Sequence, residues 1–166
     1  RWKEPTGQSY PNDTPTPEPI KELFPRAEFP NELDRSLLEM LEPNRFLRLI
    51  HDCVVYDGGV KKVCRPNQYF AFEAAKPRIL NKQSGIIWHS QGAGKSLMMV
   101  WLAQWILENM PNDPRVVIIT DRDELDKQIT NGFKDAGHKP VRAKSANHLL
   151  SMLSEVEPNL ICTLIH

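Results

Sequence analysis

The residues between Ile86 and Ser96 have the types and the spacing of a phosphate-binding loop. An apolar run, residues 86–88, leads into a glycine-containing turn, and Lys95 and Ser96 then open a long apolar segment. Gly92 and Gly94 allow the backbone to approach a ligand closely, and successive N–H groups in such a turn bind anions together with the N-terminus of the following helix. The pattern therefore predicts a nucleotide site with Mg²⁺.

The predicted roles follow from the side chains. Lys95 is expected to reach the β- and γ-phosphates of ATP, and the Ser96 hydroxyl is expected to hold Mg²⁺, so these two residues are the catalytic candidates. His89 stands where the pattern G-x-x-x-x-G-K-[ST] has its first glycine. The alternative is a chance glycine-rich turn with an exposed lysine. The expected nucleotide-binding residues of the loop are Ser90, Gln91, Gly92, Ala93, Gly94, Lys95 and Ser96.

Gln68 is a candidate for reading the base of the nucleotide. It opens an apolar helical pattern 21 positions before His89. One glutamine amide can both donate to and accept from an adenine edge. A solvated glutamine at the start of a helix is the competing interpretation, and the sequence leaves both open.

Asp121 and Arg122 follow a buried strand and admit several roles. Asp121 is a candidate for the carboxylate that holds Mg²⁺, or for a helix N-cap. Arg122 is a candidate for pairing with a DNA phosphate, or for a surface ion pair of little energetic effect. The sequence does not decide among these roles.

These candidates are positioned by an alternation of strands and helices from Gly85 onward. Apolar strands are predicted at 86–88, 116–119, about 141–143 and 159–165, and helices at about 95–109, 122–135 and after Ser145. This order predicts an α/β fold with a parallel sheet covered by helices on both faces, in which ligands bind at the carboxyl ends of the strands. The phosphate loop, Thr120–Arg122 and Thr163 lie at such ends.

The residues before Gly85 do not show this alternation of strands and helices. Residues 1–33 hold half of the 14 prolines and predict an extended linker. Two short helices follow: Asp34 is expected to cap the first, and Pro43 to sit in the first turn of the second, with Phe46, Leu47, Leu49 and Ile50 inward. Residues 53–64 predict a β-hairpin turning at Gly58 and Gly59, and a helix after Arg65 is expected to be limited or kinked at Pro77.

Composition excludes several classes. Lys and Arg total 21, as do Asp and Glu, so the net charge is zero and argues neither for nor against a nucleic-acid partner. The longest apolar stretch, residues 97–107, is too short to span a bilayer. The three cysteines are widely spaced and fit neither a disulfide framework nor a zinc site, which favours core thiols in a cytoplasmic protein.

Several stretches together resemble one family, the restriction (motor) subunit of type I restriction–modification enzymes, within helicase superfamily 2. The loop Trp88–Met99 is similar to that family's ATP loop, and residues 65–71 resemble its adenine-reading segment, which carries Arg65 and Gln68. Residues 119–128 resemble a motif that touches the DNA backbone, and residues 161–166 resemble the start of a further DNA-contacting motif. By this resemblance the DNA-binding residues are Thr120, Asp121, Arg122 and Thr163.

The resemblance implies a partial RecA-like P-loop NTPase domain over residues 85–166, preceded by a lead-in with the adenine segment over 34–84 and the proline-rich linker over 1–33. It implies that the chain is a fragment, with an endonuclease domain before it and a second ATPase lobe after it. The parent would hydrolyse ATP with Mg²⁺, translocate duplex DNA and cleave it with modification and specificity subunits. The fragment alone is expected to bind ATP at most. Two alternatives stay open: a superfamily 2 helicase or remodeller without a nuclease, and a nucleotide-binding module without chemistry.

Overall fold

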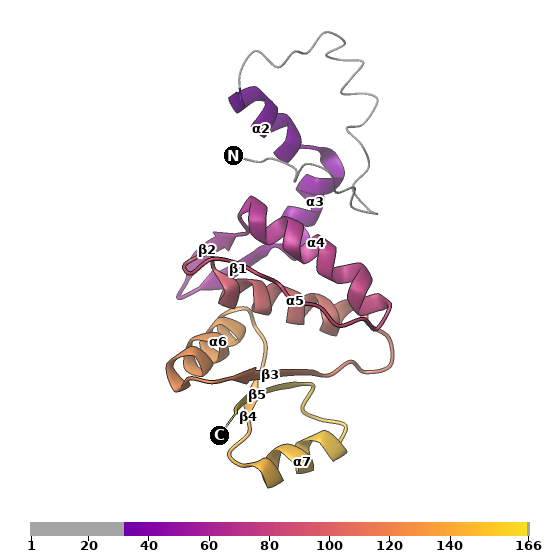
Figure 1. The fold of residues 1–166 in the computed structure, drawn as a ribbon, viewed down its shortest axis with the longest axis vertical. Helices are drawn as coiled ribbons and strands as arrows, with labels where there is room; N and C mark the ends of the chain where they lie inside the picture. Colours follow the sequence, from indigo (N-terminus) through magenta and orange to yellow (C-terminus); the bar gives the residue numbers. More distant parts are fainter. Residues whose placement is uncertain (1–31, 166) are drawn as a thin grey trace. The chain divides into compact units, whose positions relative to one another are not determined.

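The computed structural model describes residues 32–165, so nearly all of the predicted proline-rich linker lies outside the described residues. Contacts within the chain define two compact units. The first unit contains the described residues up to Cys53 together with Cys64–Ile87, and the second contains Val54–Val63 together with the chain from Trp88 onward. The order of the elements along the chain is shown in Figure 1.

The first unit is helical. It consists of α2 (Glu32–Met40), α3 (Pro43–Asp52) and α4 (Pro66–Leu80). Glu42 caps α3, because its carboxylate accepts from the backbone N–H groups of Asn44 at 3.1 Å and Arg45 at 2.7 Å. α4 continues through Pro77 to Leu80, so Pro77 does not end this helix, and the alternative expectation that it kinks the helix stays a prediction. A proline one turn from a helix end removes a single internal hydrogen bond there.

The prediction that α3 turns its apolar residues inward is wrong for three of them. Leu49 is 3% exposed, but Phe46, Leu47 and Ile50 are 40%, 64% and 55% exposed. α3 meets α4 through charged side chains instead. Arg45 is buried with its guanidinium carbon 5.8 Å from the ring centroid of Tyr69 and 5.6 Å from that of Phe70.

Four charged residues join the end of α3 to the middle of α4, and we call them the α3–α4 ion cluster: Arg48, Asp52, Glu73 and Lys76. The Lys76 ammonium lies 2.7 Å from Asp52 and 2.6 Å from Glu73, which also accepts from Arg48 at 3.2 Å. Burial works to raise the pKa of Asp52, but hydrogen bonds from Lys76 and His51 outweigh it and lower that pKa. Charges so far removed from water are stable only while all their partners are present.

The cysteines are core thiols, as predicted. Cys53, Cys64 and Cys162 are free and buried. The hydrogen bond of the Cys53 thiol to Cys64, together with burial, raises the pKa of Cys53. Among residues 32–165 no three His, Cys, Asp or Glu side chains gather into a group that could hold a metal ion.

The second unit begins with the predicted hairpin, β1 (Val54–Asp57) and β2 (Val60–Val63), paired antiparallel from Val54 opposite Val63. Gly58 and Gly59 take φ values of +58° and +79°, the left-handed conformation that a two-residue hairpin turn requires. The Gly58 N–H donates to Asp135 Oδ2 at 2.8 Å and so ties the turn to α6 (Asp123–Asp135).

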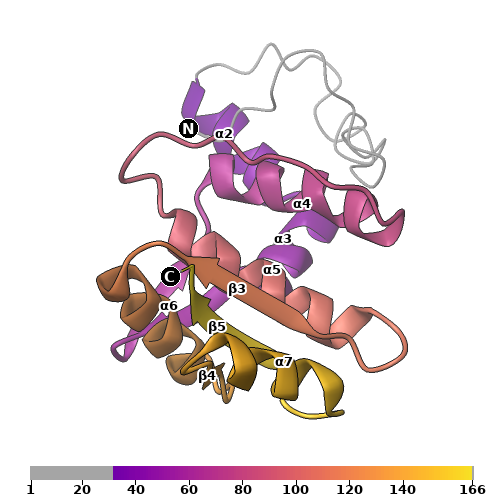
Figure 2. The ribbon, with the colours of Figure 1, turned by 60° about the horizontal axis from the view of Figure 1, so that its bottom comes forward.

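A three-stranded parallel sheet forms the centre of the second unit. Its spatial order is β3 (Val116–Thr120), β5 (Leu160–Leu164) and β4 (Val141–Arg142), so the last strand along the chain lies between the other two. Figure 2 shows β3 and β5 side by side. The predicted α/β class is confirmed.

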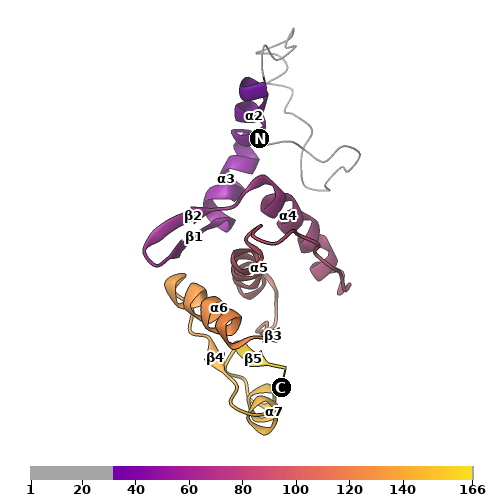
Figure 3. The ribbon, with the colours of Figure 1, turned by 60° about the vertical axis from the view of Figure 1, so that its left-hand side comes forward.

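Helices cover both faces of this sheet. α6 lies on one side and α7 (Ala146–Ser154) on the other, as Figure 3 shows. Met152 of α7 packs against Ala143 and Ile161. α5 (Lys95–Asn109) contacts β3 and α6, and it buries Val100 and Trp101. The three helices and the three strands of this sheet therefore fall where the apolar pattern placed them.

The strand predicted at residues 86–88 is absent. Ile86, Ile87 and Trp88 are 90%, 40% and 90% exposed and have no ladder partner. A strand exists only where a neighbouring strand completes its hydrogen bonds, and in the described residues the sheet ends at β3.

Candidate nucleotide and DNA site

The loop from His89 to Gly94 has the backbone conformation that a phosphate nest requires. Gly92 and Gly94 both take φ of +76°, and Gly94 is the N-cap of α5. A Cβ added at Gly92 would meet no atom within 4 Å, so the glycine is required by its dihedral angles and not by crowding. The loop thus leads directly into the N-terminus of a 15-residue helix.

Lys95 is folded back onto this loop. Its ammonium group donates to the carbonyl oxygens of His89 at 3.1 Å and Ser90 at 2.9 Å. The side chain is exposed and Ser96 beside it is half-buried. Left-handed glycines, a helix N-terminus and an exposed ammonium group at the loop together fit the phosphates of a nucleotide, with Ser96 as the hydroxyl suited to Mg²⁺.

Gln68 lies in the first unit, at the start of α4, and its side chain is only 3% exposed, so it is not a solvated glutamine. Its Oε1 accepts from the backbone N–H of Arg65 at 2.7 Å, which closes a capping box at the helix start. Arg65 is exposed beside it.

Thr120 and Thr163 come together at the carboxyl ends of β3 and β5. Thr163 is paired in register with Ile119, and the Ile165 N–H donates to the Thr120 carbonyl at 3.0 Å. Both threonine side chains are buried, at 5% and 8% exposure. Asp121 and Arg122 follow in an exposed turn, where the Arg122 Nε lies 3.6 Å from Asp121 Oδ2.

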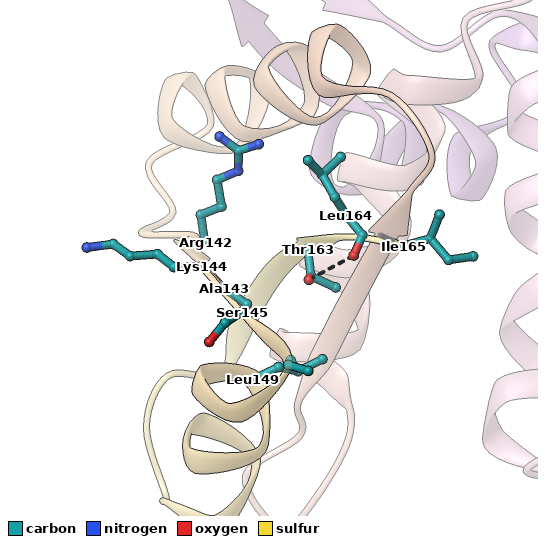
Figure 4. Close-up of a pocket in the computed structure, with 9 residues that line it drawn as sticks. Arg142, Ala143, Lys144, Ser145, Leu149, Thr163, Leu164 and Ile165 are labelled. Atoms are coloured by element: carbon teal, nitrogen blue, oxygen red, sulfur yellow. Dashed lines mark hydrogen bonds between the residues drawn. The ribbon is translucent and has the colours of Figure 1, made fainter.

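A pocket of about 460 Å³ opens at this edge between β4, β5 and the start of α7. Figure 4 shows Thr163 and Ser145 at its wall, with the Thr163 hydroxyl donating to the Leu164 carbonyl at 3.3 Å. The Arg142 guanidinium reaches away from the pocket toward α6, and Lys144 extends outward. The pocket therefore offers hydroxyl groups and apolar walls more than cationic charge.

The sequence analysis missed the partners that surround this edge. Asp126 of α6 is 1% exposed, and its Oδ2 lies 2.7 Å from Nε of Arg142 on β4. The other side of the guanidinium pairs with Asp123, which also pairs with Lys127 at 2.5 Å. Hydrogen bonds from Lys127 and then Arg142 lower the pKa of Asp123, and the bond to Asp123 raises the pKa of Arg142. Only the acidic character of residues 121–126 signalled this arrangement.

Comparison with known proteins gives two kinds of match. The model of the SWI2/SNF2 ATPase family matches residues 67–166, which include the phosphate loop and the whole three-stranded sheet. The type I restriction enzyme HindI endonuclease subunit of Haemophilus influenzae is 26% identical over 149 residues, covering 80% of this chain. A subunit of Methanocaldococcus jannaschii, provisionally named the MjaIXP type I restriction endonuclease subunit, is 27% identical over 140 residues and covers 78% of this chain.

These relatives confirm the resemblance drawn from the motifs. The chain spans 14% of the length of the Haemophilus protein and 13% of that of the Methanocaldococcus protein. The SWI2/SNF2 ATPase match is consistent with a RecA-like arrangement of the sheet. Within residues 32–165, none of the helices has the length and apolar character needed to cross a membrane.

Proposed function

Because the chain belongs to the SWI2/SNF2 ATPase family, we propose that it binds ATP with Mg²⁺ as part of the DNA-translocating motor of a type I restriction subunit. The observation that carries the proposal is the loop before α5, with two left-handed glycines and Lys95 at a helix N-terminus. The names of the relatives supply the class of parent protein.

Each residue of the proposed nucleotide site has a separate task. The backbone N–H groups of Ser90–Gly94 surround phosphate oxygens, Lys95 neutralises their charge, and the Ser96 hydroxyl holds the metal. Arg65 and Gln68 recognise the adenine base. Mg-ATP, when bound, supplies the phosphoryl group whose transfer to water drives the motor.

The carboxyl edge of the sheet is the proposed DNA contact. Thr120, Asp121, Arg122 and Thr163 come from the ends of two adjacent strands, and Arg122 is exposed where a phosphate of the backbone can reach it. In the parent protein we propose duplex DNA as the substrate and the modification and specificity subunits of a type I complex as partners.

A motor without a nuclease is the second candidate. The family match favours it, because that family is defined by its ATPase alone. Cleavage of circular duplex DNA with ATP by the full-length protein separates the two. Translocation without cleavage would support the second candidate.

The test of the nucleotide site is Lys95→Ala in the full-length protein. Loss of a charge-assisted contact to phosphate is expected to weaken Mg-ATP binding by about 1.5–3 kcal/mol, or roughly 10- to 150-fold. Lys139→Ala, which removes another exposed lysine of the second unit, is the matched control and should bind as the unaltered protein does. Equal affinities of the Lys95→Ala and Lys139→Ala variants in calorimetric titration would remove the phosphate-loop assignment.

A further inference from the structure

The turn proposed to contact DNA lies in an acidic neighbourhood. Residues 121–127 contain four carboxylates against two basic side chains, and three of the carboxylates stand in the first turn of α6. Acidic side chains stabilise the N-terminus of a helix through its dipole, which explains their presence. The same charges repel a DNA phosphate that approaches Arg122, so something must offset them if the turn binds DNA.

Arg142, which lies on β4, compensates two of these negative charges. Its guanidinium group pairs with Asp126 at 2.7 Å through Nε and with Asp123 through a terminal nitrogen. Asp126 is 1% exposed, so its charge is held in a water-poor environment and Arg142 is the cation that compensates it there. Figure 4 shows the side chain directed toward α6 and not into the pocket beside it.

We propose that Arg142 is a positioning residue for DNA binding. It holds the first turn of α6 against β4 and neutralises negative charge in that turn, so that Arg122 can bind a DNA phosphate. The inference rests on the proposed DNA role of Thr120–Arg122. The distance along the chain is short, since Arg122 is the N-cap of α6 and Asp123 is its first residue. Any shift of that first turn therefore moves the backbone of the DNA-contacting residues directly.

The mechanism predicts a particular dependence on salt. Arg142→Gln leaves Asp123 and Asp126 without this partner, and the exposed part of that negative charge acts on DNA through solvent. Such an interaction is screened as the ionic strength rises. We expect the Kd for DNA to rise about three- to tenfold near 50 mM salt, a size usual for residues of one ion-pair network, with the ratio to the unaltered protein shrinking near 200 mM.

The experiment measures the anisotropy of a fluorophore-labelled, mixed-sequence duplex with the full-length protein, with Arg142→Gln and with three further variants of the network. Arg142→Lys should retain most of the affinity, and adding Asp123→Asn to Arg142→Gln should restore part of what Arg142→Gln loses. Asp123→Asn alone leaves the Asp126 pair in place and carries little risk to folding, because Asp123 is 43% exposed; it should bind DNA at least as tightly as the unaltered protein. Mg-ATP affinity should be unchanged in these variants.

The outcomes separate the inference from the proposed function. If Arg122→Gln leaves DNA affinity unchanged, the DNA role of the turn is wrong. If Arg122→Gln weakens binding but Arg142→Gln does not, or weakens it equally at both salt concentrations, the positioning role of Arg142 is wrong. If Arg142→Gln fails to fold, weaker DNA binding by Asp123→Asn would by itself overturn the inference, and tighter binding would support it.

Discussion

The phosphate loop is the proposed phosphate-binding element and the start of α4 the proposed base-reading element, yet the two are built in opposite ways. The loop before α5 is exposed and is held by its own backbone, by two left-handed glycines and by Lys95 bonds to its carbonyls. The start of α4 is buried: Gln68 is 3% exposed, Arg45 lies against the rings of Tyr69 and Phe70, and the α3–α4 ion cluster fixes the same helix one to two turns further on.

This difference indicates which element can recognise the phosphates and which can discriminate between bases. A loop whose conformation depends on φ angles accepts any triphosphate, because phosphates are common to all nucleotides. A buried amide on a packed helix can discriminate between bases, because it has few alternative positions. Substitutions in the loop should therefore change affinity without stability, and substitutions around α4 should do the reverse or change selectivity.

Lys76→Met is the strongest test of that contrast. The substitution leaves the buried Glu73 and the partly buried Asp52 without their shared cation, and we expect a loss of about 3 kcal/mol in the free energy of unfolding. Urea denaturation measures it, with Lys61→Met on the exposed hairpin as the control. A loss no larger than that of Lys61→Met would show that the cluster does not hold α4, and the comparison would fail.

Substitutions of Gln68 test the same comparison through the selectivity for the nucleotide base. Gln68→Glu keeps an oxygen that accepts from the Arg65 N–H but removes the amide donor. The preference for ATP over GTP should fall by at least about tenfold while stability is retained. Gln68→Ala should lose both the preference and, through the lost cap, roughly 0.5–1 kcal/mol of stability. An unchanged ratio of ATP to GTP affinities in both variants would restrict Gln68 to its capping role.

The smallest expected effect is on the stability of the protein at acidic pH. The folded-state pKa of Asp52 is lowered, so its contribution to stability is present at neutral pH and is lost as the pH falls through that lowered value. Asp52→Asn removes this contribution, and the decline of stability below about pH 4 should become shallower. Urea denaturation across that range, with Asp113→Asn as an exposed control, tests it; parallel curves for Asp52→Asn and the unaltered protein would exclude the effect.

Local patterns sufficed for much of the fold. The helix after Lys95, the strand Val116–Thr120 and the cap at Ser145, which accepts from the His148 N–H at 3.1 Å, all depend on residues within a few positions of each other. The hairpin turn was equally readable, because two adjacent glycines leave few other conformations. Thr120 and Thr163 could be placed together because parallel strands end at one edge.

What the sequence could not show depends on distant residues. Asp52 and Lys76 are 24 positions apart, and Asp126 of α6 pairs with Arg142 in the next element, β4. The same limit explains why the strand predicted at residues 86–88 is absent: these residues are apolar, but none of the described residues pairs with them in a ladder. For α3, apolar spacing indicated an inward face, but α4 presents aromatic rings that contact Arg45 and a carboxylate that pairs with Arg48.

The bonds from Lys95 to the carbonyls of His89 and Ser90 also bear on the kinetics of the site. These two oxygens compete with the incoming phosphates for the same ammonium protons. The two carbonyl oxygens therefore act as intramolecular competitors of the nucleotide phosphates for the Lys95 ammonium group. The measured dissociation constant then equals the intrinsic one divided by the fraction of molecules whose lysine is released. Stopped-flow association should show this release as an observed rate that levels off as the nucleotide concentration rises.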